Sequence, residues 1–388
     1  MADETADDIL PNIFTLNQTE KATMNFLRNV ERPTFQGSQI FLPLILFLWI
    51  MPKKPRSFGF LGGLALVSGL LFYLPPAQAV EITPFNIQNQ SPLVMIYGLP
   101  SIGEASLVPA GKVDGRFTLD FANNFIEISK NTPQGEELVL DGESTQATLD
   151  IRYGVAQRME LGIQIPYVTV NGGFLDSFIE RFHSATGAGQ GLRPLEPRNR
   201  FLYYYEKDGK MQFYRNSSLE GLGDIRLSGG WQLYQEPAGA VALRASLKFP
   251  TGERFLGSGG TDLALWITTR KDFRAGNGQI AVFGGAGILG LTEGNLLPNQ
   301  QRSVVWFGNI GAGWSPLSWL AIKAQFDGHT PFYKDSDLRP LSHNAALLTF
   351  GGTVAFSRQT SLEISVTEDL EYNTAPDVVF HFALRHRF

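Results

Sequence analysis

Apolar and polar residues alternate with a period of two along many short segments of this chain, and the alternation is clearest in residues 377–388. In an extended strand, successive side chains point to opposite faces. One face then carries Val378, Phe380, Phe382, Leu384, His386 and Phe388, and the other carries Val379, His381, Ala383, Arg385 and Arg387. The pattern predicts a strand with one face in an apolar environment and the other face in water.

The same alternation predicts twelve strands in the part of the chain that follows Gly111. We expect them near residues 112–125, 145–155, 159–170, 222–234, 240–250, 261–271, 279–290, 302–314, 318–328, 343–356, 360–370 and 377–388. Short links such as "AQR" and "SPLS" alternate with long links at 171–221, 291–303 and 328–343. Short turns at one rim and long loops at the other are typical of outer-membrane barrels.

In a bilayer, a sheet of this kind must close, because an open edge would leave backbone groups without partners in hydrocarbon. The sequence therefore predicts an all-β fold. We expect a transmembrane, antiparallel, up-and-down β-barrel of about twelve strands over residues 111–388, with a long extracellular loop that contains a short helix. A soluble β-sandwich also alternates in this way and is the alternative.

Two apolar runs precede these strands. The first, "IFLPLILFLWI" at residues 40–50, is shorter than the ~20 residues that a membrane-spanning helix needs. The second run, within residues 51–79, has a basic start, an apolar stretch and the closing sequence Ala77-x-Ala79, which is the layout of a secretory signal peptide. We expect cleavage after Ala79 and export to the bacterial outer membrane.

Residues 1–50 then have two interpretations. They are either an upstream extension that results from a start codon assigned too early, or a genuine disordered or membrane-anchoring extension. Residues 80–110 come before the first predicted strand and also have two interpretations, a periplasmic segment or a plug in the lumen of the barrel.

Composition adds little to this picture and excludes some alternatives. The chain has 388 residues, 41 glycines and no cysteine, so neither disulfides nor thiolate metal sites can form. A formal net charge of -5 argues against a nucleic-acid surface. We expect no metal site and no cofactor.

Four stretches of the sequence resemble an uncharacterised family of Gram-negative outer-membrane β-barrel proteins, domain of unknown function 3187. They are "PFNIQNQSPLVMIYGLP", "FLDSFIERFHSATGAGQG", "LKFPTG" and the final "FHFALRHRF". The resemblance implies an outer-membrane location and a barrel, but no substrate. The terminal strand also resembles the signal that the barrel-assembly machinery reads, and its candidate residues are Phe380, Phe382, Leu384 and Phe388. The other partners expected are outer-membrane lipids, lipopolysaccharide and an unknown small solute.

Charged residues of both signs fall on the predicted inward face. The candidates for the lining of the lumen are Asp150, Arg152, Glu160, Asp224, Arg226, Arg244, Lys248, Lys323, Asp327, Arg385 and Arg387. A ladder of one sign would indicate selection of oppositely charged solutes. Mixed signs indicate either cross-strand pairs that fill much of the lumen or charges that line a solute path.

The long loop at residues 171–221 contains apolar residues at helical spacing. The candidates on this stripe are Phe174, Phe178, Ile179 and Phe182. They predict either a helix that packs on the barrel mouth or a hydrophobic vestibule that captures apolar ligands. Further along, "KDGK" in an aromatic stretch predicts a hairpin turn.

The lumen of a twelve-strand barrel is intermediate in width between small, filled barrels and open porins. We therefore expect a porin-like protein, with a narrow or gated channel or transporter for small solutes, with hydrophobic solutes as one option. The alternatives are a structural or surface-binding barrel without transport and, less favoured, a lipid-modifying enzyme of the outer membrane. The pairs His183–Ser184 and Ser342–His343 supply the residue types for such an enzyme, but adjacent residues on a strand point to opposite faces.

Overall fold

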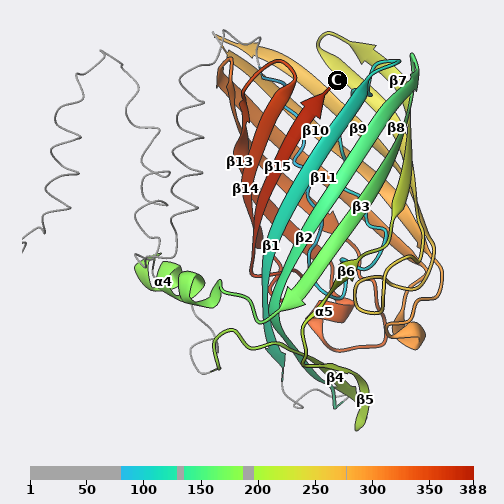
Figure 1. Ribbon diagram of the computed structural model, residues 1–388, viewed down its shortest axis with the longest axis vertical. Coiled ribbons are helices and arrows are strands. Elements are labelled where there is room, and N and C mark those ends of the chain that lie inside the picture. Colours follow the sequence, from blue (N-terminus) through green and yellow to red (C-terminus); the bar gives the residue numbers. More distant parts are fainter. Residues whose placement is uncertain (1–79, 129–134, 187–195, 277) are drawn as a thin grey trace, which may run out of the picture. The chain divides into compact units, whose positions relative to one another are not determined.

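The computed structural model describes residues 80–128, 135–186, 196–276 and 278–388. The predicted upstream extension and signal peptide, residues 1–50 and 51–79, lie outside the described residues. In the described part, twelve long antiparallel strands form a closed barrel (Figure 1). They are β1 (Val113–Ile128), β2 (Glu137–Ala156), β3 (Met159–Asn171), β7 (Arg226–Glu236), β8 (Gly239–Lys248), β9 (Asp262–Ala275), β10 (Gly278–Leu291), β11 (Val304–Leu317), β12 (Leu320–His329), β13 (Ala345–Ala355), β14 (Thr360–Asp369) and β15 (Val378–Arg387).

The first and last strands close the barrel. Strand β1 pairs with β2 on one side and with β15 on the other, where Phe121 lies opposite Phe380. Each barrel strand therefore has two neighbours, which is the condition for crossing a bilayer without unpaired backbone groups. The predicted fold and its twelve strands are confirmed.

One predicted boundary is wrong. The second strand was expected to begin near residue 145, but β2 begins at Glu137. The reason is that Leu138, Val139 and Leu140 are all buried, because β2 extends past the barrel ring and is covered there. A strand that is buried on both faces shows no alternation in its sequence.

Because apolar and polar residues alternate along each strand, the apolar side chains lie on one face of the wall and the polar side chains on the other. On β9, Leu263, Leu265 and Ile267 are 58%, 48% and 48% exposed on the outer face. The residues that alternate with them, Asp262, Ala264 and Trp266, are buried on the inner face. Apolar side chains outside and polar side chains inside are the arrangement of a membrane barrel.

Short turns join the strands at one end of the barrel, here called the turn end, and longer connections meet at the other, the loop end (Figure 1). The loop-end elements are α4 (Asp176–Thr186), β4 (Leu202–Lys207), β5 (Lys210–Arg215), β6 (Leu219–Leu222), the short 3-10 helix η2 (Pro298–Gln300) and α5 (Arg339–Ser342). Between β4 and β5, Asp208 and Gly209 both have positive φ angles, 53° and 70°, so the predicted hairpin is confirmed. Among the described residues, no helix is both long enough and apolar enough to cross a membrane.

Residues 80–110, here called the inner segment, run inside the ring of strands, where Figure 1 shows them as a cyan trace. The segment starts at the turn end, where the backbone N–H of Val80 donates to the carbonyl of Ser318 (2.7 Å). At the loop end, the ring of Tyr97 stacks on Phe332 with 4.9 Å between ring centroids. The segment then returns to the turn end, where the N–H of Gly111 donates to a carbonyl in β2.

The inner segment thus forms a long hairpin with an ascending arm (80–90), a tip and a descending arm (98–110). Its tip contributes to an apolar core at the loop end. This core contains Leu93, Ile96 and Tyr97 of the tip, together with Leu138, Tyr205, Leu256, Leu297, Phe332 and Tyr333.

Glycines on the inner face of the wall provide room for the two arms. A Cβ atom at Gly313 would lie 2.5 Å from Cγ2 of Ile82 on the ascending arm. A Cβ atom at Gly285 would lie 2.6 Å from Cγ2 of Ile102 on the descending arm. Any larger residue at these two positions would push the inner segment away from the wall.

The last residue completes the closing ladder. The N–H of Phe388 donates to the carbonyl of Val113 (2.9 Å), and its side chain is exposed on the outer face beside His386. We expect deletion of Phe388 to reduce severalfold the yield of assembled barrel, measured as heat-modifiable mobility on a gel. The Phe388→Tyr variant keeps the ring and should assemble normally. Equal yields of the deleted and complete chains would contradict this prediction.

Candidate functional site

The ascending arm is held to the inner face of β12. The N–H of Phe85 donates to Oε1 of Gln325 (2.7 Å), and Nζ of Lys323 donates to the carbonyl of Thr83 (3.0 Å). The same ammonium lies 4.0 Å from the centroid of the Phe85 ring. Alternate residues of a strand share one face, so Lys323 and Gln325 both reach into the lumen and fix the arm.

The descending arm is held to another part of the wall, mainly by β9 and β8. The N–H of Gly98 donates to Oδ2 of Asp262 (2.7 Å). The indole N–H of Trp266 donates to the carbonyl of Ile102 (2.7 Å). These contacts lie at inward positions of β9, so the wall has the side chains that pair with an irregular backbone.

A cluster of buried charges attaches the descending arm to the strands that close the barrel. Oε1 of Glu104 accepts a hydrogen bond from Arg116 (2.7 Å), and Oε2 accepts one from Arg385 (2.6 Å). We call this group the Glu104 cluster. Its members are Glu104, Asp114, Arg116, Arg152, Arg385 and Arg387.

The cluster keeps Glu104 ionised although its side chain is only 5% exposed. Burial raises the pKa of Glu104, but the guanidiniums of Arg385, Arg152 and Arg116 outweigh burial and hold the pKa well below 4.5. Removal of one partner of a buried ion pair typically costs about 3–5 kcal/mol, because the remaining charge is left uncompensated. Sequence reasoning did not select Glu104, since it lies outside the alternating segments.

The charged residues predicted to line the lumen lie inside the barrel, and most of them are buried. This group comprises Asp150, Arg152, Glu160, Asp224, Arg226, Arg244, Lys248, Lys323, Asp327, Arg385 and Arg387. Nζ of Lys248 lies 2.5 Å from Asp224 and 3.2 Å from Asp262, and Arg244 lies 2.6 Å from Glu160. This geometry favours the interpretation of paired charges that fill the lumen over charges that line an open path.

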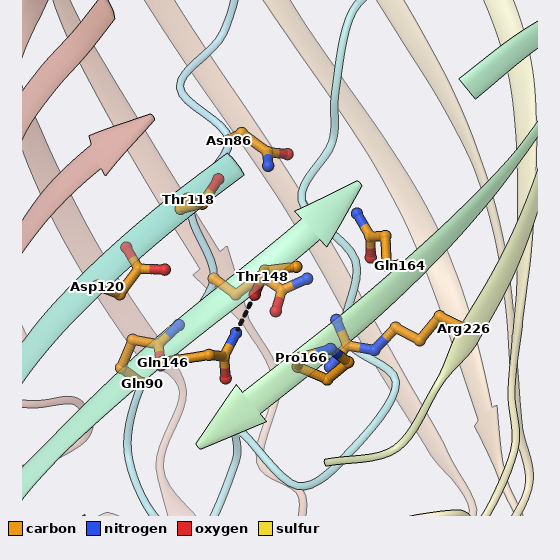
Figure 2. Close-up of a pocket in the computed structure, with 10 residues that line it drawn as sticks. Asn86, Gln90, Thr118, Asp120, Gln146, Thr148, Gln164, Pro166 and Arg226 are labelled. Atoms are coloured by element: carbon orange, nitrogen blue, oxygen red, sulfur yellow. Dashed lines mark hydrogen bonds between the residues drawn. The ribbon is translucent and has the colours of Figure 1, made fainter. Parts of the chain in front are cut away.

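A small polar cavity remains between the inner segment and strands β1, β2, β3 and β7, and Figure 2 shows the side chains around it. Its volume is about 20 Å³. Most of its lining consists of amides and hydroxyls, from Asn86, Gln90, Thr118, Gln146, Thr148 and Gln164. Sequence reasoning missed these residues because it searched the inward positions for charges, although the same alternation places uncharged polar residues there.

Helix α4 begins beside the outer face of the barrel, where Phe174 and Phe178 contact β1 and β15, and it extends away from the wall (Figure 1). The N–H groups of Phe174 and Leu175 donate to the carboxylate of Glu143 (2.8 and 2.5 Å). This carboxylate fixes the chain where it enters the helix, since backbone N–H groups there have no partner within the helix.

The predicted capture residues of this loop face the membrane side of the wall. The ring of Phe174 packs on Phe121 (6.4 Å between centroids) and the ring of Phe178 packs on Phe380 (5.8 Å). Ile179 is buried. The side chain of Phe182 lies outside the described part of the chain. Ligand capture by this helix stays a prediction, and a captured ligand would lie outside the lumen.

The residue pairs considered for lipid hydrolysis show no poised nucleophile in the described structure. The side chain of His183 lies outside the described residues. Oγ of Ser342 lies 3.1 Å from Nδ1 of His343, but it donates its proton to the carbonyl of Leu338 (2.9 Å). A nucleophilic serine instead donates to its general base.

Comparison with known proteins gives a family and several barrels. The family described as "Protein of unknown function (DUF3187)" matches residues 73–388. No curated protein matches the sequence. Among solved structures, the COG4313 outer membrane channel from Pseudomonas putida F1 is 11% identical, with a TM-score of 0.47, over 73% of this chain and 98% of that chain.

Two further structures are also similar to this chain. The NanC porin is 7% identical, with a TM-score of 0.36, over 70% of this chain and 97% of that chain. The toluene transporter TodX from Pseudomonas putida is 10% identical, with a TM-score of 0.33, over 79% of this chain and 99% of that chain. Identities and TM-scores of this size carry no argument about a shared solute.

We expect Phe178→Asp to destabilise the protein, because the substitution places a charge against the ring of Phe380 at a half-buried position on the outer wall. The loss should be about 2 kcal/mol or more and should appear as a lower melting temperature. Phe178→Leu, which stays apolar, is the matched control. An Asp variant that melts like the wild type would show that the contact does not stabilise the protein. Loss of hydrophobic-solute uptake at an unchanged melting temperature would instead support ligand capture.

Proposed function

The chain belongs to the family described as protein of unknown function DUF3187, and we propose that it is an outer-membrane channel for small solutes, held nearly closed by its inner segment. The observation that carries the proposal is the occupation of the lumen by residues 80–110, attached to the wall on both arms by hydrogen bonds and ion pairs. The outer membrane is the proposed location because the outer wall exposes apolar side chains all round. In this location the loop end faces the cell exterior and the turn end faces the periplasm.

The width of the barrel supports a gated channel over an open one. Side chains alone fill small barrels, whereas barrels of 16–18 strands leave a channel of water. In this intermediate barrel, the two arms run through the lumen, and the cavity between them and β1, β2, β3 and β7 has a volume of about 20 Å³. Conduction of ions through the lumen therefore requires the inner segment to move.

The contacts of the arms are of a kind that permits movement. They consist largely of polar groups of the wall that donate to, or accept from, the backbone of the segment, and water can replace such partners when the segment leaves. The Glu104 cluster is the main exception, since Arg116 and Arg385 of the wall have the carboxylate of Glu104 only while the segment is in place. We propose that the Glu104 cluster holds the inner segment in the lumen and so keeps the channel closed.

We expect Glu104→Gln to open the channel, because it removes the carboxylate through which Arg116 and Arg385 hold the segment. In planar bilayers at neutral pH, the open probability should rise tenfold or more, which corresponds to about 1.4 kcal/mol. Glu253→Gln, a change at an exposed loop position, is the matched control and should behave like the wild type. Absence of conductance in every variant, with the barrel folded, would contradict a channel and leave a structural barrel.

Acid should open the wild-type channel for the same reason. The folded-state pKa of Glu104 lies below its ordinary value of 4.5, so its contribution is complete above pH 4.5 and is lost as pH falls through the folded pKa. We expect conductance to rise reversibly as the pH is lowered below 4.5 towards the folded pKa of Glu104. The Glu104→Gln channel should already be open and should lose most of this dependence. An acid response of equal size in the variant would show that other groups control the gate.

A further inference from the structure

The outer wall marks the depth at which α4 leaves the barrel. Phe117, Leu119 and Phe121 take successive outward positions on β1, and the next outward position towards the loop end is polar, at Asn123. The amide of Asn123 donates to Oδ1 of Asp176 at the start of α4 (3.2 Å). The apolar band of β1 therefore ends at Phe121, and α4 starts at the boundary between the hydrocarbon and the headgroups of the membrane.

The apolar surface of the wall continues onto the chain that enters α4. Phe174 lies just before the helix, and its ring packs on the outward ring of Phe121 (6.4 Å between centroids). Phe174 is nevertheless 66% exposed, whereas Ile179 of the helix is buried. On another side of the helix, Asp176 accepts a hydrogen bond from the N–H of Asn199 (2.7 Å). The exposed ring of Phe174 thus extends the face of the barrel that contacts lipid.

The charged groups that α4 exposes are cationic. Arg181 is exposed and follows Phe178 by three positions, so the two side chains lie on the same side of the helix. Arg198 pairs with Glu180 (2.5 Å), and its side chain is 62% exposed while that of Glu180 is 12% exposed. The carboxylate of Asp176 is also buried. The surface beside the apolar rings therefore presents two guanidiniums, and its carboxylates are covered.

This combination fits a lipid that carries both acyl chains and phosphate groups. Apolar rings at the edge of the hydrocarbon accept acyl chains, and nearby cations attract anionic headgroups. Arginine in particular binds phosphate through pairs of parallel N–H···O hydrogen bonds. In the proposed orientation the loop end faces the cell exterior, so the lipid at this depth belongs to the outer leaflet. The acylated and phosphorylated lipid of that leaflet is lipopolysaccharide.

We infer that α4 is an interfacial helix that binds lipopolysaccharide of the outer leaflet. Phe174 contacts the acyl chains, and Arg181 and Arg198 bind the phosphate groups above them. This inference rests on the location and orientation that the proposed function gives the barrel, but it does not depend on the inner segment. It also gives the apolar stripe of the long loop a partner other than a transported solute.

The test is the affinity of the complete, purified protein for lipopolysaccharide in detergent, measured by native mass spectrometry. The double substitution Arg181→Gln and Arg198→Gln removes both guanidiniums, and we expect it to raise the Kd at least tenfold. Phe174→Ala removes an exposed ring and should raise the Kd at least threefold. Heat-modifiable mobility on a gel confirms that the barrel of each variant is folded.

A matched control removes the same charge from other loop-end connections. Lys210 and Arg254 are both exposed there, outside α4. The double substitution Lys210→Gln and Arg254→Gln should leave the Kd within twofold of the wild type. A loss of affinity equal to that of the α4 double variant would show that the total charge of the loop end attracts the lipid, and would overturn the site.

A second lipid tests the assignment to lipopolysaccharide. Phosphatidylglycerol also has acyl chains and an anionic phosphate, and the wild type should bind it at least tenfold more weakly in the same detergent. Equal affinities would show a general anionic-lipid surface and overturn the assignment. A wild type that does not bind lipopolysaccharide would overturn the site itself, as would α4 variants that bind it like the wild type.

The orientation of the barrel is tested separately. Because the chain has no cysteine, Lys210→Cys provides a single site for a membrane-impermeant maleimide on intact cells. Labelling supports the proposed orientation, and its absence would overturn both that orientation and the leaflet assigned to α4. If the site is labelled but the α4 variants bind lipopolysaccharide normally, only the lipid site is wrong. Failure of Glu104→Gln to conduct would instead remove the channel and leave the lipid site in place.

Discussion

The antiparallel ladder between β1 and β15 is the interaction on which the rest of the structure depends. It joins the first and last barrel strands over ten residue pairs, from Asp114–Arg387 to Asn123–Val378. Because the sheet closes there, its two faces become an outside and an inside. The same ladder brings Arg385 beside Asp114, so the charges that hold Glu104 are assembled by closure itself.

Closure also explains why the lumen can hold so many ionisable groups. An isolated charge in a low-dielectric interior is strongly unfavourable, but each cation here meets a carboxylate or a backbone carbonyl. The inner segment supplies part of that compensation, through Glu104 and through the carbonyls of Thr83 and Tyr97. The wall and the segment therefore form one network of polar contacts, and neither is electrostatically complete alone.

The sequence was sufficient to predict the strands of the barrel, but not the contacts inside the lumen. Alternation over short segments predicts each of the twelve strands, since one face of each meets an apolar environment and the other a polar one. It fails at residues 137–144, where covering elements bury both faces. Helical spacing predicts α4 itself, but the side of the wall on which it packs depends on Phe121 and Phe380, which are distant in sequence.

The partners inside the barrel could not be predicted for a similar reason. Inward charges are visible from alternation, yet their partners come partly from an irregular segment with no period of its own. Glu104 and the uncharged cavity residues therefore became visible only in the fold. A search of inward positions for runs of threonine and glutamine would have found Thr118, Gln146 and Thr148.

The path of the inner segment has a topological consequence. Val80 and Gly111 both lie at the turn end, so the segment enters and leaves the lumen through the same rim. A hairpin of this kind can leave the lumen through that rim. Neither a chain end has to pass through the ring nor any pair of strands has to separate. Reversible unplugging of this barrel is therefore compatible with a sheet that never opens.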